Sequence, residues 1–117
     1  MPGTNVNPNP ASNPIREWED TEEVRVEATL LVKPLGPLPR QVLAVLSTSA
    51  EAIEGGELSS TLNAPVEEIQ NAVSRVNSFA EAFGFVPLIS SEESGGFYID
   101  ASAARVVSAA LERTEQR

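Results

Sequence analysis

The sequence predicts a small α+β domain, and three features lead to this class. Residues 66–83 carry apolar side chains three or four positions apart, which is the spacing of one face of a long helix. Residues 85–99 contain two short apolar runs around a polar turn closed by Gly95 and Gly96, which predicts a β-hairpin. Residues 24–32 alternate between apolar and polar side chains, which predicts a half-buried strand.

A flexible arm is expected at the amino end. Residues 1–20, "MPGTNVNPNPASNPIREWED", hold four of the nine prolines and few apolar side chains, so burial cannot offset the entropy of ordering them. We therefore expect one domain over residues 21–117. Ile15 and Trp18 stand out near the end of the arm, and we take them as candidate contacts with a partner. The alternative is that Trp18 packs on its own domain.

The predicted strand, residues 24–33, comes before the other elements of the domain. "PLGPLP" (34–39) then breaks the chain, because proline suits neither a helix interior nor a strand ladder. The strand would keep an exposed edge unless it pairs, and an unpaired edge invites a partner strand. Its inward side chains would be Val24, Val26, Ala28, Leu30 and Val32.

Two helices and a short extended piece are expected next. The first helix follows Pro39 and covers residues 40–53. Gly55 and Gly56 end this segment, and Ile53 beside them is expected in the short extended piece. The second helix covers residues 57–63. Asn63 is a natural end for it, since asparagine tolerates the left-handed backbone. The inward side chains would be Val42, Leu43, Leu46, Ala50, Leu58 and Leu62.

The longest predicted helix occupies residues 66–83 and anchors the fold. Pro65 opens it, Glu67 and Glu68 suit the positive end of the helix dipole, and Gly84 stops it. After the hairpin, Asp100 or Ser102 caps a last helix over residues 101–113. The inward side chains of the two helices would be Val66, Ile69, Val73, Val76, Ala80, Phe83, Val106, Val107, Ala110 and Leu111.

This order of elements is that of a winged helix-turn-helix, with an extra strand and a disordered arm at the amino end. The run "VLAVLSTSAEAIEGGELSSTLNAPVEEIQNAVSRVNSFAEAFGFVPLISSEESGGFYI" resembles the first winged helix of segregation and condensation protein B. The resemblance covers residues 40–113 and rests on Glu57-Leu58, the long helix, Gly84 and Gly95-Gly96-Phe97. It implies an acidic protein that dimerises and grips a kleisin-type partner in a chromosome-organising complex. That family has two winged helices in tandem, whereas this chain has room for one.

Charge favours a protein partner over nucleic acid. Lys and Arg number 8 against 17 Asp and Glu, for a net charge of −9, so the overall field repels phosphate. The long helix carries a single base, Arg75, and the hairpin carries Glu92 and Glu93. Candidate nucleic-acid contacts are Arg25, Lys33, Arg40 and Arg75; candidate partner contacts are Ile15, Trp18, Gln70 and Asn77.

Catalysis is not expected. The chain has no histidine and no cysteine, and its adjacent carboxylates diverge in direction rather than forming pairs. We expect no catalytic, cofactor-binding or metal-binding residues. No apolar run approaches the roughly 20 residues that span a membrane, so we expect a cytoplasmic protein without membrane contact.

The function expected from these features is that of a non-enzymatic protein-interaction module. It would be a homodimer, formed through residues 24–32 or through the last helix, and an accessory subunit of a chromosome-organising or nucleoprotein complex. One alternative is a dimeric winged-helix transcription regulator that binds DNA. A further alternative is a small structural or phage-assembly protein that uses its arm, in which case deleting residues 1–20 would leave the melting temperature nearly unchanged.

Overall fold

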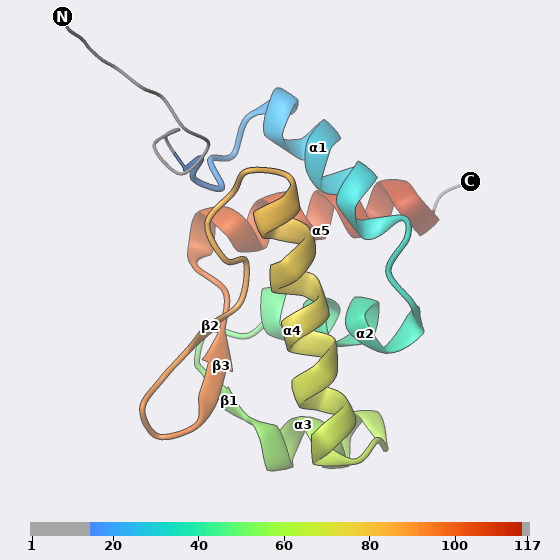
Figure 1. The fold of residues 1–117 in the computed structure, drawn as a ribbon, viewed down its shortest axis with the longest axis vertical. Coiled ribbons are helices and arrows are strands. Elements are labelled where there is room, and N and C mark those ends of the chain that lie inside the picture. The colour runs from blue at the N-terminus through green and yellow to red at the C-terminus, as the bar shows by residue number, and fades with distance from the viewer. Residues whose placement is uncertain (1–14, 116–117) are drawn as a thin grey trace, which may run out of the picture.

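The computed structural model of the protein describes residues 15–115 (Figure 1). Of the arm predicted over residues 1–20, residues 1–14 lie outside this part. Within the described residues the chain forms five helices and three short strands. In order they are α1 (Glu22–Val32), α2 (Pro37–Ser47), β1 (Ile53–Glu54), α3 (Gly55–Leu62), α4 (Val66–Ala82), β2 (Ser90–Ser91), β3 (Gly96–Tyr98) and α5 (Ala101–Glu115).

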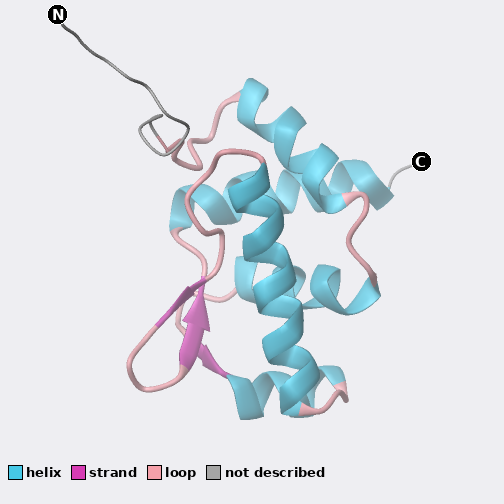
Figure 2. Ribbon diagram, viewed as in Figure 1, coloured by secondary structure: helices cyan, strands magenta, loops and turns pink. Residues whose placement is uncertain are grey.

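The strands form one antiparallel sheet in the order β1-β3-β2 (Figure 2). Ile53 is paired with Phe97, and Ser90 with Tyr98. Helices therefore pack beside a small antiparallel sheet, which confirms the predicted α+β class. In Figure 1 the helix α4 runs between two ends of the molecule, with α1 and α5 at one end and α3 at the other. No helix in residues 15–115 is long and apolar enough to cross a membrane.

The strand predicted over residues 24–33 is wrong, because residues 22–32 form the helix α1. Its buried side chains are Val24, Ala28, Leu31 and Val32, at the spacing of one helix face. Val26 and Leu30, which the strand would have buried, are 45% and 54% exposed. Thr21 caps the helix by accepting the backbone N–H of Val24, and Glu22 and Glu23 occupy its first turn.

Helix α1 packs along α5, so the two ends of the described chain share one core. The side chains of Val106, Val107, Ala110 and Leu111 are buried as predicted. At the surface of this contact the guanidinium of Arg113 donates to both carboxylate oxygens of Glu22, at 2.9 and 3.1 Å. The pKa of Glu22 is held below its usual value, chiefly by this hydrogen bond and by the charge of Arg113.

Helix α2 lies earlier than predicted, at Pro37–Ser47 instead of residues 40–53. Gly36 precedes it, and it ends where the hydroxyl of Thr48 donates back to the carbonyls of Ala44 and Val45. Ala50 therefore falls outside the helix and is exposed, contrary to prediction. The extended piece at Ile53 is confirmed as β1. Gly55 and Gly56 do not end a segment, because they form the first turn of α3.

The predicted end of α3 at Asn63 is confirmed, and α4 begins one residue after Pro65. Asn63 ends α3 in the left-handed conformation, with φ of 56°, and Pro65 is the capping residue directly before α4. Gly84 follows α4 with φ of +86°, which a residue with a side chain rarely adopts. Ile69, Val73, Val76 and Ala80 are buried as expected, but Val66 is 41% exposed because the helix begins at the rim of the core.

The hairpin is shorter on its first side than predicted. Of the expected strand over residues 85–89, Phe85 forms one parallel bridge with Arg16, and regular pairing begins only at Ser90. The backbone of Leu88 and Ile89 is bonded to the side chain of Asn77 instead of to a strand. In the returning strand Gly96 lies close to Ala52, where an added Cβ would approach the Cβ of Ala52 to 3.0 Å.

Candidate partner-binding surface

Trp18 packs on its own domain, which was one of its two predicted roles. Its side chain is 5% exposed, and its ring stacks on that of Phe85 with centroids 4.0 Å apart. The indole Nε1–H donates to the backbone carbonyl of Val86 at 2.9 Å. Because the aromatic face and the polar edge both have partners inside the domain, Trp18 is not free to contact another protein.

The neighbouring Arg16 binds the same segment to the rest of the domain. Its backbone N–H donates to the carbonyl of Gly84, and its carbonyl accepts from the N–H of Val86, both at 2.9 Å. Its guanidinium lies 4.4 Å from the centroid of Phe85 and forms an ion pair of 2.6 Å with Glu27. Residues 15–18, here called the N-terminal segment, are therefore joined to the loop after α4 and to α1.

A groove lies beside the N-terminal segment, along the carboxyl-terminal half of α4. It has a volume of about 490 Å³. Ile15 stands at this groove with 65% of its side chain exposed, the largest exposure among the exposed large apolar side chains of the described chain. We call this hollow the apolar groove; its lining residues are Ile15, Val73, Ser74, Asn77, Ser78, Glu81, Phe85, Val86 and Pro87.

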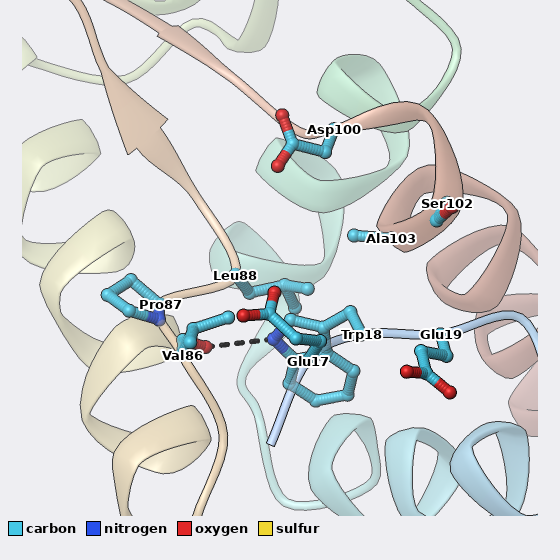
Figure 3. A pocket seen from close by; sticks show the side chains of 9 residues that line it. All are labelled: Glu17, Trp18, Glu19, Val86, Pro87, Leu88, Asp100, Ser102 and Ala103. Atoms are coloured by element: carbon cyan, nitrogen blue, oxygen red, sulfur yellow. Dashed lines mark hydrogen bonds between the residues drawn. The ribbon is translucent and has the colours of Figure 1, made fainter. Parts of the chain in front are cut away.

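A second hollow of about 230 Å³ adjoins the first, since Val86 and Pro87 line both. Three exposed carboxylates lie around it, those of Glu17, Glu19 and Asp100 (Figure 3). We call this hollow the acidic pocket; Trp18, Val86, Pro87, Leu88, Ser102 and Ala103 complete its lining.

The carboxylates of the acidic pocket lie apart from one another. Within the described part of the chain, no three Asp, Glu, His or Cys side chains are grouped closely enough to hold a metal ion. The carboxylates of Glu17, Glu19 and Asp100 are therefore spread around the hollow. That arrangement suits a larger cationic group better than a bare ion.

The other predicted partner contacts, Asn77 and Gln70, have different environments. The Asn77 Oδ1 accepts from the N–H groups of Leu88 and Ile89 at 3.0 and 2.9 Å, and its Nδ2 donates to the carbonyl of Ile89. Asn77 lines the apolar groove, but its amide is already used within the fold. Gln70 is exposed on α4 and does not line either hollow.

The four predicted nucleic-acid contacts belong to three elements: Arg25 and Lys33 lie in and at the end of α1, Arg40 in α2 and Arg75 in α4. The Nε and Nη2 of Arg25 bind the carboxylate of Asp20 at 2.8 and 2.7 Å, at the start of α1. At the other end of α1, Arg40 donates to the carbonyls of Val32 and Lys33, at 3.3 and 2.7 Å. These two guanidinium groups are occupied in holding the fold.

Lys33 and Arg75 remain exposed at the surface. The guanidinium of Arg75 lies 5.0 Å from the ring centroid of Phe79 on its own helix. The outward side of α4 also carries Glu67, Glu68 and Glu81. Acidic groups thus outnumber the single base on this helix, as predicted from the sequence.

Sequence reasoning missed the acidic pocket, although the residues from Arg16 to Glu19 held a signal for it. In "REWE" the side chains of Arg16 and Trp18 would lie on one side of an extended backbone, with Glu17 and Glu19 on the other. The structure has this arrangement: Arg16 and Trp18 contact Phe85, while Glu17 and Glu19 line the pocket. Asp100 joins them from the far side of the hairpin, which no local pattern indicated.

Comparisons of the chain with models of protein families, with curated proteins and with solved structures give no match.

Proposed function

We propose that this protein is a winged-helix module that binds another protein and catalyses no reaction. The order of elements supports the fold: α2, β1, α3, a tight turn, α4, the β2–β3 hairpin and α5. The strand order β1-β3-β2 supports it as well, since the hairpin pairs with the short strand that precedes α3. In this interpretation α3 and α4 are the helix-turn-helix, and the hairpin is the wing.

The observation that carries the protein-binding role is the apolar groove on α4. Ile15 is 65% exposed there, beside Val73, Val86 and Pro87. A hollow of this kind, lined by apolar side chains with a few polar groups, is typical of binding sites. Phosphate binding needs several free bases on one face. Here two of the four candidates, Arg25 and Arg40, are bonded within the fold.

The setting we propose is an accessory subunit of a chromosome-organising or nucleoprotein complex. Its support is the resemblance of residues 40–113 to the first winged helix of segregation and condensation protein B. The formal charge of −9 adds to that support, because an acidic subunit reaches a nucleoprotein complex through its protein components.

A DNA titration tests the choice of partner class. Fluorescence anisotropy of labelled double-stranded fragments would be followed with the protein at about 50 and 200 mM salt. We expect no binding at either salt concentration. Binding at low salt that weakens steeply at high salt would contradict the proposal and favour the DNA-binding regulator.

A positive test uses a photo-crosslinking amino acid at two serines. Ser78 lines the apolar groove, whereas Ser60 is exposed on α3 and lines neither hollow. With the crosslinker at position 78 we expect one defined protein adduct in cells, and with the crosslinker at position 60 none. The same adducts from both positions, or none from position 78, would contradict a partner at this groove.

A further inference from the structure

We propose that the apolar groove and the acidic pocket together bind one peptide segment of a partner protein, with an apolar side chain in the groove and a lysine or arginine in the pocket. This inference rests on the proposed function and specifies the chemistry of the partner. The two hollows lie on either side of Val86 and Pro87, which line both. A single segment can therefore reach both without crossing the fold.

The groove sets the apolar part of the segment. Ile15, Val73 and Val86 give it an apolar lining, and its volume of about 490 Å³ accommodates more than one side chain. An isoleucine that is 65% exposed next to such a lining gains burial when a partner side chain covers it. Ser74 and Ser78 supply hydroxyl groups at the groove for the polar backbone of the segment.

The carboxylates of the acidic pocket predict that the bound segment carries a positive charge. These carboxylates are those of Glu17, Glu19 and Asp100, and neither hollow is lined by a basic residue. The one base next to them, Arg16, is directed to Glu27 and to the ring of Phe85. The amino end of α5 adds about half a positive charge, which leaves the carboxylates in excess.

The shape of the pocket favours a long cationic side chain. Lysine and arginine carry their charge on an aliphatic stem that packs on apolar surface. Val86, which is half-buried, and Pro87, which is exposed, provide apolar surface at the pocket, and the carboxylates lie around it. The carboxylates are not grouped closely enough to hold a metal ion, within the described residues.

Charge also argues against an occupant from the same chain. The segment before Ile15, "MPGTNVNPNPASNP", contains no lysine and no arginine, so it cannot fill the acidic pocket with a cationic side chain. In a second copy, Arg16, Arg25 and Arg113 are in ion pairs and Arg40 caps α1. Its exposed bases Lys33, Arg75 and Arg105 lie at the end of α1, in α4 and in α5, and none of them belongs to an extended segment. A different protein with a basic segment is the better match.

The test selects peptides from a displayed library of random twelve-residue sequences on the full-length protein. We expect the enriched peptides to carry lysine or arginine close to a large apolar residue. Their affinity would then be measured by anisotropy for the wild type and for the triple variant Glu17→Gln, Glu19→Gln, Asp100→Asn. These changes remove charge but keep size, and Asn is as favourable as Asp at the position before a helix.

We expect the triple variant to bind the peptides about tenfold or more weakly and with less salt dependence. The control is the double variant Glu67→Gln, Glu68→Gln, which removes charge from the far end of α4, and its affinity should change by less than about twofold. Ser78→Trp should abolish binding by filling the groove. Melting curves of all variants check that the fold is retained.

Three results would overturn the inference. Enriched peptides without a basic residue, or no enrichment, would show that the pocket does not select for charge. Equal losses in the triple variant and the control would show a general effect of net charge. A dimer mass that falls to that of a monomer in Ser78→Trp would identify a second copy as the occupant. If a crosslinked adduct still forms at position 78, any of these results contradicts only the peptide chemistry proposed here, and the protein-binding function is kept. Binding of DNA in the titration would contradict the protein-binding function itself.

Discussion

The indole ring of Trp18 stacks on the ring of Phe85, with centroids 4.0 Å apart and planes 14° from parallel. These residues are 67 positions apart, and they join the end of the predicted arm to the loop after α4. The contact makes Trp18 part of the core. It also places Glu17 and Glu19 beside Asp100, so the acidic pocket depends on it.

Replacing Trp18 by alanine should therefore destabilise the domain strongly. The change removes a large side chain that is 95% buried and leaves the carbonyl of Val86 without its donor. Core replacements of Phe or Trp by Ala cost about 3–5 kcal/mol. We expect the free energy of unfolding in urea to fall by this amount. Deletion of residues 1–20 should lower the melting temperature as well, contrary to the expectation for a flexible arm.

Ile15→Ala is the matched control for Trp18→Ala. Ile15 belongs to the same segment but is 65% exposed, so its truncation should change stability by less than about 0.5 kcal/mol. A similar loss in both variants would contradict the burial of Trp18. A melting temperature unchanged by Trp18→Ala would contradict it as well.

Asn77 should be as important for stability as a core residue, although it lies on the outward half of α4. Its replacement by alanine leaves the N–H groups of Leu88 and Ile89 and the carbonyl of Ile89 without their partner. A buried donor left unsatisfied costs about 1–3 kcal/mol, and we expect Asn77→Ala to lose at least this much. Ser78→Ala, one position away and exposed, should be nearly neutral in the same denaturation series.

Asn63 tests the tight turn between α3 and α4. Its φ of 56° lies in the left-handed region, which glycine adopts freely and a β-branched residue adopts only with strain. Asn63→Gly should match or exceed the stability of the wild type. Asn63→Val should lose about 1–2 kcal/mol. Equal melting temperatures for the two variants would show that the turn does not need this conformation.

The centre of the fold was predictable from the sequence because local signals there agree with each other. In α4 the apolar spacing, Pro65 before the helix and Gly84 after it all define the same segment. The turn after α3 was also predictable, because asparagine at position 63 by itself favours the left-handed backbone. Where spacing, caps and turn residues agree, the sequence determines the element without knowledge of its neighbours.

The prediction of a strand over residues 24–33 was wrong because the sequence there fits both the two-residue spacing of a strand and the spacing of a helix. Val24, Ala28 and Val32 satisfy both an alternating pattern and a helical one. Leu30 and Leu31 decide between them, and only the packing on α5 shows that Leu31 is buried while Leu30 is exposed. Thr21 with Glu22 and Glu23 was the local signal for a helix start.

The candidate site was largely beyond sequence reasoning because it is assembled by contacts between distant residues. The bridge between Arg16 and Phe85 brings the N-terminal segment to α4, and no pattern in either segment specifies this pairing. Ile15, one of the predicted partner contacts, lines the apolar groove. Residue type predicts that a base is available to phosphate, but it does not indicate that Arg25 and Arg40 are bonded within the fold.

The ion pair between Glu22 and Arg113 predicts a pH-dependent contribution to stability. The pKa of Glu22 is lower in the folded state than its ordinary value of 4.5. The ion pair therefore stabilises the fold at pH values above 4.5, and this contribution is lost as the pH falls through the pKa of the folded state. Glu22→Gln should therefore be less stable than the wild type at pH 7, and the difference should vanish in strong acid. Glu23→Gln is the control, because Glu23 has no ion pair within the described residues.

The outer face of α1 is the place to test self-association. The predicted free strand edge is absent from residues 22–32, so a dimer cannot form through it. Val26 and Leu30, one helical turn apart and 45% and 54% exposed, are the apolar residues that remain on that segment. A stable interface buries about 800 Å² on each partner, so these two side chains would form only its centre.

Light scattering at tens of micromolar separates the outcomes. If the α1 face mediates a dimer, the wild type has the dimer mass and Leu30→Glu has the monomer mass, with little change in melting temperature because the side chain is already exposed. Ser60→Glu, which adds the same charge on α3 at the opposite end of the molecule, should keep the dimer mass. A monomeric wild type would rule out self-association through α1 and leave the two exposed side chains as ordinary surface residues.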